Sequence, residues 1–360
     1  MRKFIRNYTI LFTLTFYFFS CQPQNKPIST GNQVAIPLEK ISLRSAPSQD
    51  ADENATLTSV DTLFLTGQVS KSTSRINFNG VIYNDPWVEV STKNHKKGWV
   101  YAAQLNFSDQ KQSPVFSSII QQRLINFTND VLAEKVNQYA ELYNNASTST
   151  DFHQLWEMAD SLRPQLQKLL SEKIVFNDED AVFPDFSWIE SLLPGFITIV
   201  SGHQCFLFRD FKSLGLKVIS TTGKEDDDLL AVCEAVYCLD SIEYFDPCWN
   251  IEEESAGLHS LLGDGIHLDI ASKIDTALYR SDMFQQQLYQ IKKTWMQDIA
   301  GKSISYWNDS NKIIRELQQI LDSDFRMLNQ SDKTTIETRI KMFREPDKNE
   351  IRLNQRAGLD

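Results

Sequence analysis

The sequence is poor in glycine and proline, has no surplus of positive charge, and contains no long apolar run. Only 13 glycines and 11 prolines occur in 360 residues, which excludes a collagen-like or low-complexity chain and favours long helices. Acidic residues number 47, against 36 for lysine plus arginine, and the formal net charge is -11. Proteins that hold a nucleic-acid backbone carry a basic surplus or a dense basic stripe, so we expect no nucleic-acid partner.

Motifs of common enzymes are also missing. The sequence has no Gly-x-Ser-x-Gly elbow, no glycine-rich phosphate loop and no His-Glu-x-x-His helix. Cys205 lies in His-Gln-Cys-Phe and Cys248 in Asp-Pro-Cys-Trp, and neither setting matches the strand-to-helix start that carries the nucleophile of Cys-His peptidases. We therefore expect no cofactor, no metal and no activity of these families.

What is present begins with a leader. Arg2, Lys3 and Arg6 precede residues 8–19, an apolar run that is shorter than the ~20 residues a membrane-spanning helix needs. A basic start followed by a short apolar run predicts a signal peptide over residues 1–20.

The end of this leader, Phe-Phe-Ser-Cys at 18–21, resembles a bacterial lipobox, although Phe19 is bulkier than the usual residue. The resemblance implies that Cys21 receives a diacylglyceryl group and that the protein is a lipoprotein whose anchor contacts the membrane. An ordinary secretory leader with a coincidental cysteine is the alternative. Gln22, in place of Asp, resembles an outer-membrane sorting signal, so the expected location is the cell envelope at the outer membrane, facing the periplasm or the cell surface.

Residues 21–37 are expected to form an extended tether, because they contain three prolines and little apolar surface. The next segment, residues 38–106, has short β-type runs separated by turn-forming residues. About five or six short strands in so short a segment predict a small all-β barrel.

Three motifs in this segment resemble the bacterial SH3 family. They are Leu-Arg-Ser-Ala-Pro-Ser at 43–48, Pro-Trp-Val-Glu-Val at 86–90, and Lys-Gly-Trp-Val-Tyr-Ala-Ala-Gln-Leu at 97–105. The sequence departs from the family at Val60, where glycine is usual, and by a polar insert at 68–79.

The SH3 resemblance implies an SH3-like barrel that binds cell-wall peptide or an envelope protein. Its aromatic ligand face would consist of Tyr83, Trp87, Trp99 and Tyr101. The alternative is that these rings belong to the core of the barrel.

A polar linker at 107–114 is followed by a change of periodicity. Apolar residues recur every three or four positions from Val115, so we expect a mainly α-helical domain over 115–345 and a charged tail over 346–360. Within the domain, 197–200 and 204–208 fit either one short hairpin or a buried helix.

Four cysteines remain besides Cys21. Cys238 and Cys248 lie ten residues apart, and in an exported chain they are the pair we expect to form a disulfide between a helix end and the following loop. Free buried thiols are the alternative, which fits Cys233 on a helical stripe. A metal site that combines these cysteines with His203, His259 or His267 matches no common zinc spacing.

Two further clusters have simple structural interpretations. The acidic runs at 224–228 and 252–254 suit helix starts and lack the spacing of a calcium loop. Asp264, between two glycines, fits a turn, although with His259 and His267 it would also suit acid–base chemistry.

Two functions follow from these patterns. The first is an envelope-anchored, non-catalytic binding or scaffold protein. The alternative is an envelope hydrolase with its site in the 174–267 region. A deep pocket in which His203, His259 or His267 meets an acid or a cysteine would favour the enzyme.

Overall fold

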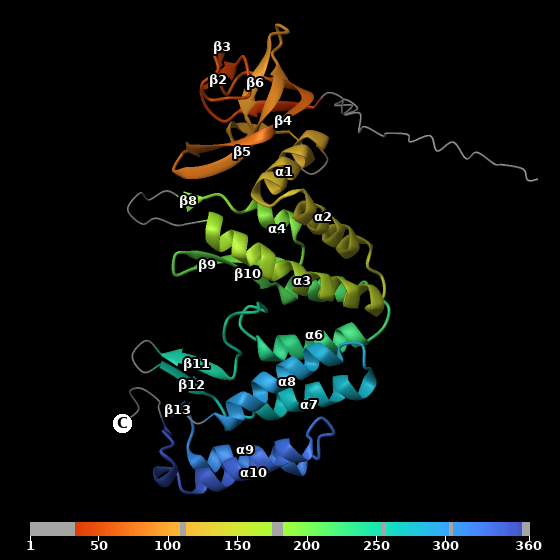
Figure 1. Cartoon of the computed structure of the whole chain (residues 1–360), viewed down its shortest axis with the longest axis vertical. Helices are drawn as coiled ribbons and strands as arrows, with labels where there is room; N and C mark the ends of the chain where they lie inside the picture. Colours follow the sequence, from red (N-terminus) through yellow and green to blue (C-terminus); the bar gives the residue numbers. More distant parts are fainter. Residues whose placement is uncertain (1–32, 109–112, 175–182, 254–256, 302–304, 355–360) are drawn as a thin grey trace, which may run out of the picture.

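The computed structural model describes residues 33–108, 113–174, 183–253, 257–301 and 305–354. It is elongated, with a β-rich part at one end and helices stacked along the rest of its length (Figure 1). The predicted signal peptide, Cys21 and all of the predicted tether before Gln33 lie outside the described residues. Within the described part of the chain, no helix is long and apolar enough to cross a membrane.

Seven antiparallel strands form the N-terminal sheet, in the order β3-β2-β6-β5-β4-β1-β7, and the two-residue strand β8 pairs in parallel with β5. The bounds are β1 Val34–Pro37, β2 Ile41–Arg44, β3 Glu53–Leu57, β4 Leu63–Phe78, β5 Val81–Ser91, β6 Lys97–Tyr101, β7 Leu105–Phe107 and β8 Phe183–Pro184. The expected small SH3-like barrel is therefore wrong: the region is a large sheet that does not close into a barrel. Residues 34–37, assigned to the tether, form an inner strand of this sheet.

The long β4–β5 hairpin explains this difference. The polar residues 68–79 do not loop out; up to Phe78 they continue β4, which pairs with β5 as far as Phe78 and Val81. Asn79 and Gly80 have φ angles of 53° and 82°, which a two-residue hairpin turn requires. Serine, threonine and isoleucine in this segment are compatible with an extended strand.

A first helix, α1 (Pro114–Phe127), joins the sheet to the helical part. Its Val115 and Ile119 complete the apolar core of the sheet. At its other end Arg123 forms ion pairs with Asp85 of β5, at 2.6 Å, and with Asp185. The two parts of the molecule are thus connected by packing and by buried charges.

The chain after α1 is mainly helical, and with α1 the described residues contain ten α-helices. The others are α2 Asp130–Asn145, α3 Ser149–Lys173, α4 Trp188–Leu192, α5 Phe211–Val218, α6 Glu225–Val236, α7 Ile266–Arg280, α8 Gln285–Ala300, α9 Ser310–Asp322 and α10 Gln330–Arg344. A short 3-10 helix, Asp347–Asn349, follows, and Ile351 and Leu353 in the predicted tail pack against the core.

Two small sheets interrupt the helices. Strands β9 (Phe196–Ser201) and β10 (Gln204–Arg209) form a hairpin, so the strand interpretation of this segment is confirmed. The side-chain amide of Gln167 on α3 covers the outer edge of β10, since it donates to the Cys205 carbonyl and accepts from the Leu207 N–H. A second sheet, which the sequence did not predict, contains β11 (Asn250–Glu253), β12 (Gly257–Ser260) and β13 (Ser305–Tyr306).

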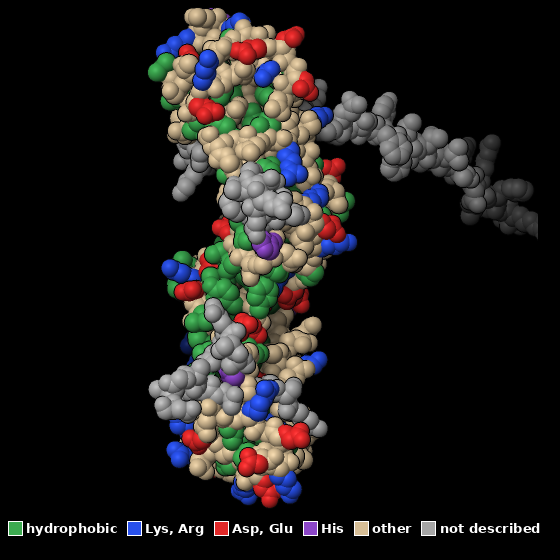
Figure 2. Space-filling view, turned by 90° about the vertical axis from the view of Figure 1, so that its left-hand side faces the viewer, with side chains coloured by type: hydrophobic (Ala, Val, Ile, Leu, Met, Phe, Trp, Pro, Cys, Tyr) green, Lys and Arg blue, Asp and Glu red, His purple; other side chains and the backbone are tan. Residues whose placement is uncertain are grey.

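The outer face of the β9–β10 hairpin is apolar. Phe206 and Phe208 contact the ring of Phe245, at centroid distances of 4.8 and 4.9 Å, and 59% of Phe245 is exposed. Figure 2, which looks at the side of the molecule that carries the hairpins, shows hydrophobic side chains gathered at mid-height. The opposite face of the hairpin, which includes Arg209, is turned to the helical core and to a cavity beside this residue.

Candidate functional site

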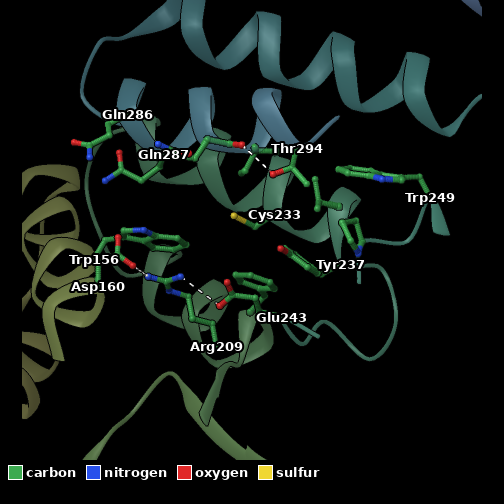
Figure 3. Close-up of a pocket in the computed structure, with 15 residues that line it drawn as sticks. Trp156, Asp160, Arg209, Cys233, Tyr237, Glu243, Trp249, Gln286, Gln287 and Thr294 are labelled. Carbon is green, nitrogen blue, oxygen red and sulfur yellow. Dashed lines mark hydrogen bonds and ion pairs between the residues drawn. The ribbon is translucent and has the colours of Figure 1, made fainter. Parts of the chain in front are cut away.

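A cavity of about 290 Å³ lies between α3, the end of β10, α6, the segment 237–249 and α8 (Figure 3). This volume is at the lower end of the range of ~300–1,000 Å³ that ligand pockets usually have. It therefore suits a small molecule rather than a peptide.

A buried arginine forms one wall. Arg209 is the last residue of β10 and is only 6% exposed, so its charge needs partners. Asp160 of α3 forms an ion pair with one of its terminal nitrogens, and Glu243 lies 3.3 Å from the other. Figure 3 shows the guanidinium between these two carboxylates. Burial lowers the pKa of Arg209, but Glu243 and Asp160 raise it by more, so the net shift is upward and the side chain stays charged.

Local structure places these charges. The N–H of Glu243 donates to the Arg209 carbonyl at 3.0 Å, so the segment after α6 runs back along the end of β10. Pro164 lies inside α3, which continues past it, and has no N–H to offer to the Asp160 carbonyl four residues before. Arg163, on the same helix, donates to Glu243 at 2.7 Å. Two guanidinium groups and two carboxylates thus balance in charge.

Aromatic and apolar side chains form the floor of the cavity. The Arg209 guanidinium carbon lies 4.1 Å from the ring centroid of Trp156, in a cation–π contact. Trp249 and Cys233 are almost fully buried. Figure 3 shows the Cys233 sulfur and the Tyr237 hydroxyl pointing into the space. Burial raises the pKa of both groups, so the thiol and the phenol are neutral at ordinary pH and Cys233 is no thiolate nucleophile.

Neutral polar side chains of α8 form the opposite wall, namely Gln286, Gln287, Gln290 and Thr294. In Figure 3 the amide of Gln287 extends from α8 toward Trp156, and Gln286 lies beside it at the edge of the cavity. Oε1 of Gln287 is buried and has no hydrogen-bond partner among the described residues. A buried acceptor without a donor is unusual in a folded protein and indicates that a ligand or solvent molecule bonds to it.

The histidines named from the sequence do not contribute to this cavity. His267 is fully buried, with its Nε2 2.8 Å from Asp298 Oδ2, and Ser260 donates to the same oxygen at 2.7 Å. The aspartate lies between the serine and the histidine, so the histidine is not placed to take the serine proton as in a catalytic triad. His259 is buried against Ser305. His203 occupies the hairpin turn with a φ of 65°.

The loop around Asp264 and the first acidic run have structural roles, whereas Glu252 and Glu253 of the second run lie in the strand β11 and not at the helix start that was expected. The Asp264 N–H closes a turn onto the Leu261 carbonyl, and Gly265 precedes α7 with a φ of 86°. Asp226, in the first acidic run, is fully buried and accepts hydrogen bonds from Ser149 and Thr221. Across the described ranges, no group of three or more histidine, cysteine or acidic side chains is arranged to hold a metal ion.

The four aromatic rings assigned to an SH3-type ligand face do not form one surface. Trp87 and Tyr101 are buried and contact each other at a centroid distance of 5.5 Å. Trp87 donates to the Ser74 hydroxyl and Tyr101 to the Ser74 carbonyl, so the polar part of β4 bonds to both rings. Tyr83 and Trp99 are half-buried, and a ligand role for them stays a prediction.

All four cysteines in the described residues are free thiols, so the Cys238–Cys248 disulfide is not formed in the structure. The two residues are nevertheless neighbours. The Cys248 N–H donates to the Val236 carbonyl at 2.7 Å, and its thiol donates to the Ala235 carbonyl at 2.9 Å. Burial, and then a hydrogen bond with Cys238, raise the pKa of Cys248 to about 12. Cys205 and Cys233 are buried.

The cavity residues were missed by sequence reasoning because they come from separate elements. One signal was present: Cys205, Leu207 and Arg209 alternate along β10, which puts an arginine on the face that the apolar residues turn to the core. Comparison with protein-family models, with curated proteins and with solved structures found no match to this chain.

Proposed function

We propose that this protein is a membrane-anchored lipoprotein of the cell envelope that binds a small molecule, without catalysis, in the cavity beside Arg209. The observation that carries the binding role is a cavity lined by a buried arginine, whose charge is balanced by Asp160 and Glu243, and by Gln287, whose buried Oε1 has no hydrogen-bond partner among the described residues. Export and anchoring rest on the leader and on Cys21. The partner would be a component of the envelope.

The arrangement favours binding over catalysis. Both carboxylates accept hydrogen bonds from an arginine, which makes them acceptors rather than proton donors. The Cys233 thiol has a raised pKa, and no histidine lines the cavity as the structure describes it. Rigid aromatic rings beside neutral amides are the composition of a recognition site.

A cavity-filling variant tests the binding role. Gln290→Trp adds bulk at the exposed mouth of the cavity, and Gln297→Trp puts the same residue on an exposed position of α8 that does not line it. Monosaccharides, nucleosides, amino acids and dipeptides are tested one by one on the full-length protein in detergent, by tryptophan fluorescence and thermal shift. We expect at least one class to bind the unaltered protein and Gln297→Trp but not Gln290→Trp. If no compound binds, or if all three proteins respond alike, the cavity is not a binding site.

Anchoring is tested separately. Cys21→Ser should abolish incorporation of a labelled fatty acid and release the protein from the membrane fraction, because Cys21 is the cysteine that ends the apolar leader. Continued labelling of this variant would contradict the lipoprotein assignment.

A further inference from the structure

We infer that the ligand of the Arg209 cavity is one uncharged saccharide ring. The inference rests on the proposed binding function and names its ligand class. It follows from the charge balance of the cavity, from its hydrogen-bonding groups and from its aromatic floor.

The charge balance disfavours ions. An anion would have to displace Asp160 or Glu243, which already occupy the terminal nitrogens of Arg209. A cation would meet the guanidinium, which already occupies the position over the ring of Trp156 where a cation would stack. An uncharged ligand disturbs neither interaction, and burying it carries no penalty for removing a charge from water.

The hydrogen-bonding groups suit hydroxyl or amide substituents. Asp160 and Glu243 offer acceptors on one wall, and the amides of Gln286 and Gln287 offer donors and acceptors on the other. A hydroxyl both donates and accepts, so a ring of hydroxyls can bond to both walls at once. A ligand hydroxyl or N–H would also supply the donor that Oε1 of Gln287 lacks among the described residues.

The aromatic floor suits the apolar C–H face of a sugar ring. The half-buried ring of Tyr237 lines the cavity together with the more deeply buried rings of Trp156 and Trp249. The volume of about 290 Å³ limits the ligand to a single ring with small substituents.

Three sugars that share a ring and differ in charge test this inference. N-acetylglucosamine is neutral, glucosamine is a cation, and glucuronate is an anion near neutral pH. In calorimetric titrations of the full-length protein, the Kd of the neutral sugar should be at least about ten-fold lower than the Kd of either charged sugar.

A charge-switch variant sharpens the test. Asp160→Asn removes one of the carboxylates that balance Arg209, and 49% of the Asp160 side chain is exposed, so the variant should fold. We expect its affinity for glucuronate to rise about ten-fold, because one positive charge is then uncompensated. Asp322→Asn, at the exposed end of α9, changes the net charge equally and should leave the order of affinities as it was.

The outcomes separate the two proposals. Equal or tighter binding of a charged sugar by the unaltered protein, or an identical response of Asp160→Asn and Asp322→Asn, would overturn the saccharide inference. If no sugar binds while a nucleoside or dipeptide binds in a way that Gln290→Trp abolishes, the ligand class is wrong and the binding site stands. If nothing on the panel is sensitive to Gln290→Trp, both proposals are wrong.

Discussion

Two buried arginines in this molecule each pair with two carboxylates and lie near a tryptophan ring, but their surroundings differ. Arg123 pairs with Asp85 and Asp185 and lies 5.2 Å from the ring centroid of Trp188. Arg209 pairs with Asp160 and Glu243 over the ring of Trp156. The side chains of the first pair of acids are 5% and 12% exposed, and those of the second pair 49% and 17%.

The difference in exposure indicates different roles. We call the cluster around Arg123 the joint, because it connects two parts of the chain, whereas the cluster around Arg209 forms a wall of the cavity. Asp85, Arg123 and Asp185 come from β5, α1 and the segment after β8, so their ion pairs hold the sheet against the helical part. Asp160 and Glu243 leave oxygen atoms near solvent beside a cavity. A buried ion pair need not stabilise a protein, because removing two charges from water is costly. Removing one partner is nevertheless destabilising, because it leaves a buried charge unpaired.

The largest expected effect comes from removing each arginine in turn. Arg123→Met removes the arginine that pairs with the carboxylates of Asp85 and Asp185, of which Asp185 keeps only its hydrogen bonds from Ser187, and should lower the free energy of unfolding by about 3–5 kcal/mol. Arg209→Met should cost less, about 1–3 kcal/mol, because Asp160 is half-exposed and can be rehydrated. Urea unfolding of the two variants at neutral pH measures both changes. Equal losses would mean that the two arginines have the same structural role.

The ion pairs around Arg123 have a pH dependence. Burial raises the pKa of Asp85 to about 6, although Arg123 opposes the shift, whereas the ordinary value is 3.8. The folded protein therefore holds this proton more tightly than the unfolded chain, and unfolding releases it between these pH values. Stability should fall by about 2–3 kcal/mol as the pH rises from about 4 to about 7.

Asp85→Asn isolates this contribution. The unfolding free energy of the unaltered protein minus that of the variant should decrease as the pH rises over that range, because only the unaltered protein has the Asp85 carboxyl group. Urea titrations at intervals across it measure the difference. A difference that grows with pH would mean that the pKa of Asp85 is lowered by Arg123, as in an exposed ion pair.

The segment that supplies Glu243 to Arg209 can be tied covalently. Oxidised glutathione would take two electrons from the Cys238 and Cys248 thiols, which lose their protons and form one disulfide, while the glutathione becomes two thiols. Closing so short a loop should stabilise the protein by about 2–3 kcal/mol. Non-reducing peptide mapping detects the bond, and Cys238→Ser is the control. Alkylation of all four thiols after oxidation and unfolding would refute the pairing.

The smallest effect concerns the opposite wall of the cavity. Gln287→Met keeps the length of the side chain and removes the buried acceptor that has no partner among the described residues, so it should raise the unfolding free energy by about 1 kcal/mol. It should also weaken saccharide binding, because the ligand loses the acceptor Oε1. Such a trade of stability for binding is common at functional sites. Gln286→Met, on an exposed neighbour, should leave stability unchanged. A loss of stability in Gln287→Met would show that its amide is bonded in the folded protein.

One part of the fold could be predicted from the sequence, and another part could not. Periodicity of apolar residues predicted the helical region, because that signal is local. The sheet was misread because the polar residues 68–79 look like a loop, although Asn79-Gly80 is a strong hairpin signal that argues for two long paired strands. The aromatic motif residues Trp87 and Tyr101 were correctly placed on strands, but both rings are buried and donate hydrogen bonds to Ser74, which lies outside their motifs.

The cavity was beyond local patterns for a similar reason. Asp160 lies on α3, Arg209 on β10 and Glu243 in the segment after α6. Tens of residues separate them, and each is ordinary in its own segment. Only the inward position of Arg209 on β10 hinted that a buried charge must find partners.

Hydrogen exchange with and without N-acetylglucosamine tests the distinction between joint and site most directly. At a saturating concentration of the sugar, backbone amides in α8 and in the segment 237–249 should exchange more slowly, because their side chains line the cavity. Amides around Arg123, in α1 and β5, should exchange as before. Protection of α1 and β5 instead, or no change in either pair of segments, would contradict this account, in which Arg209 lines a ligand site and Arg123 joins two parts of the chain.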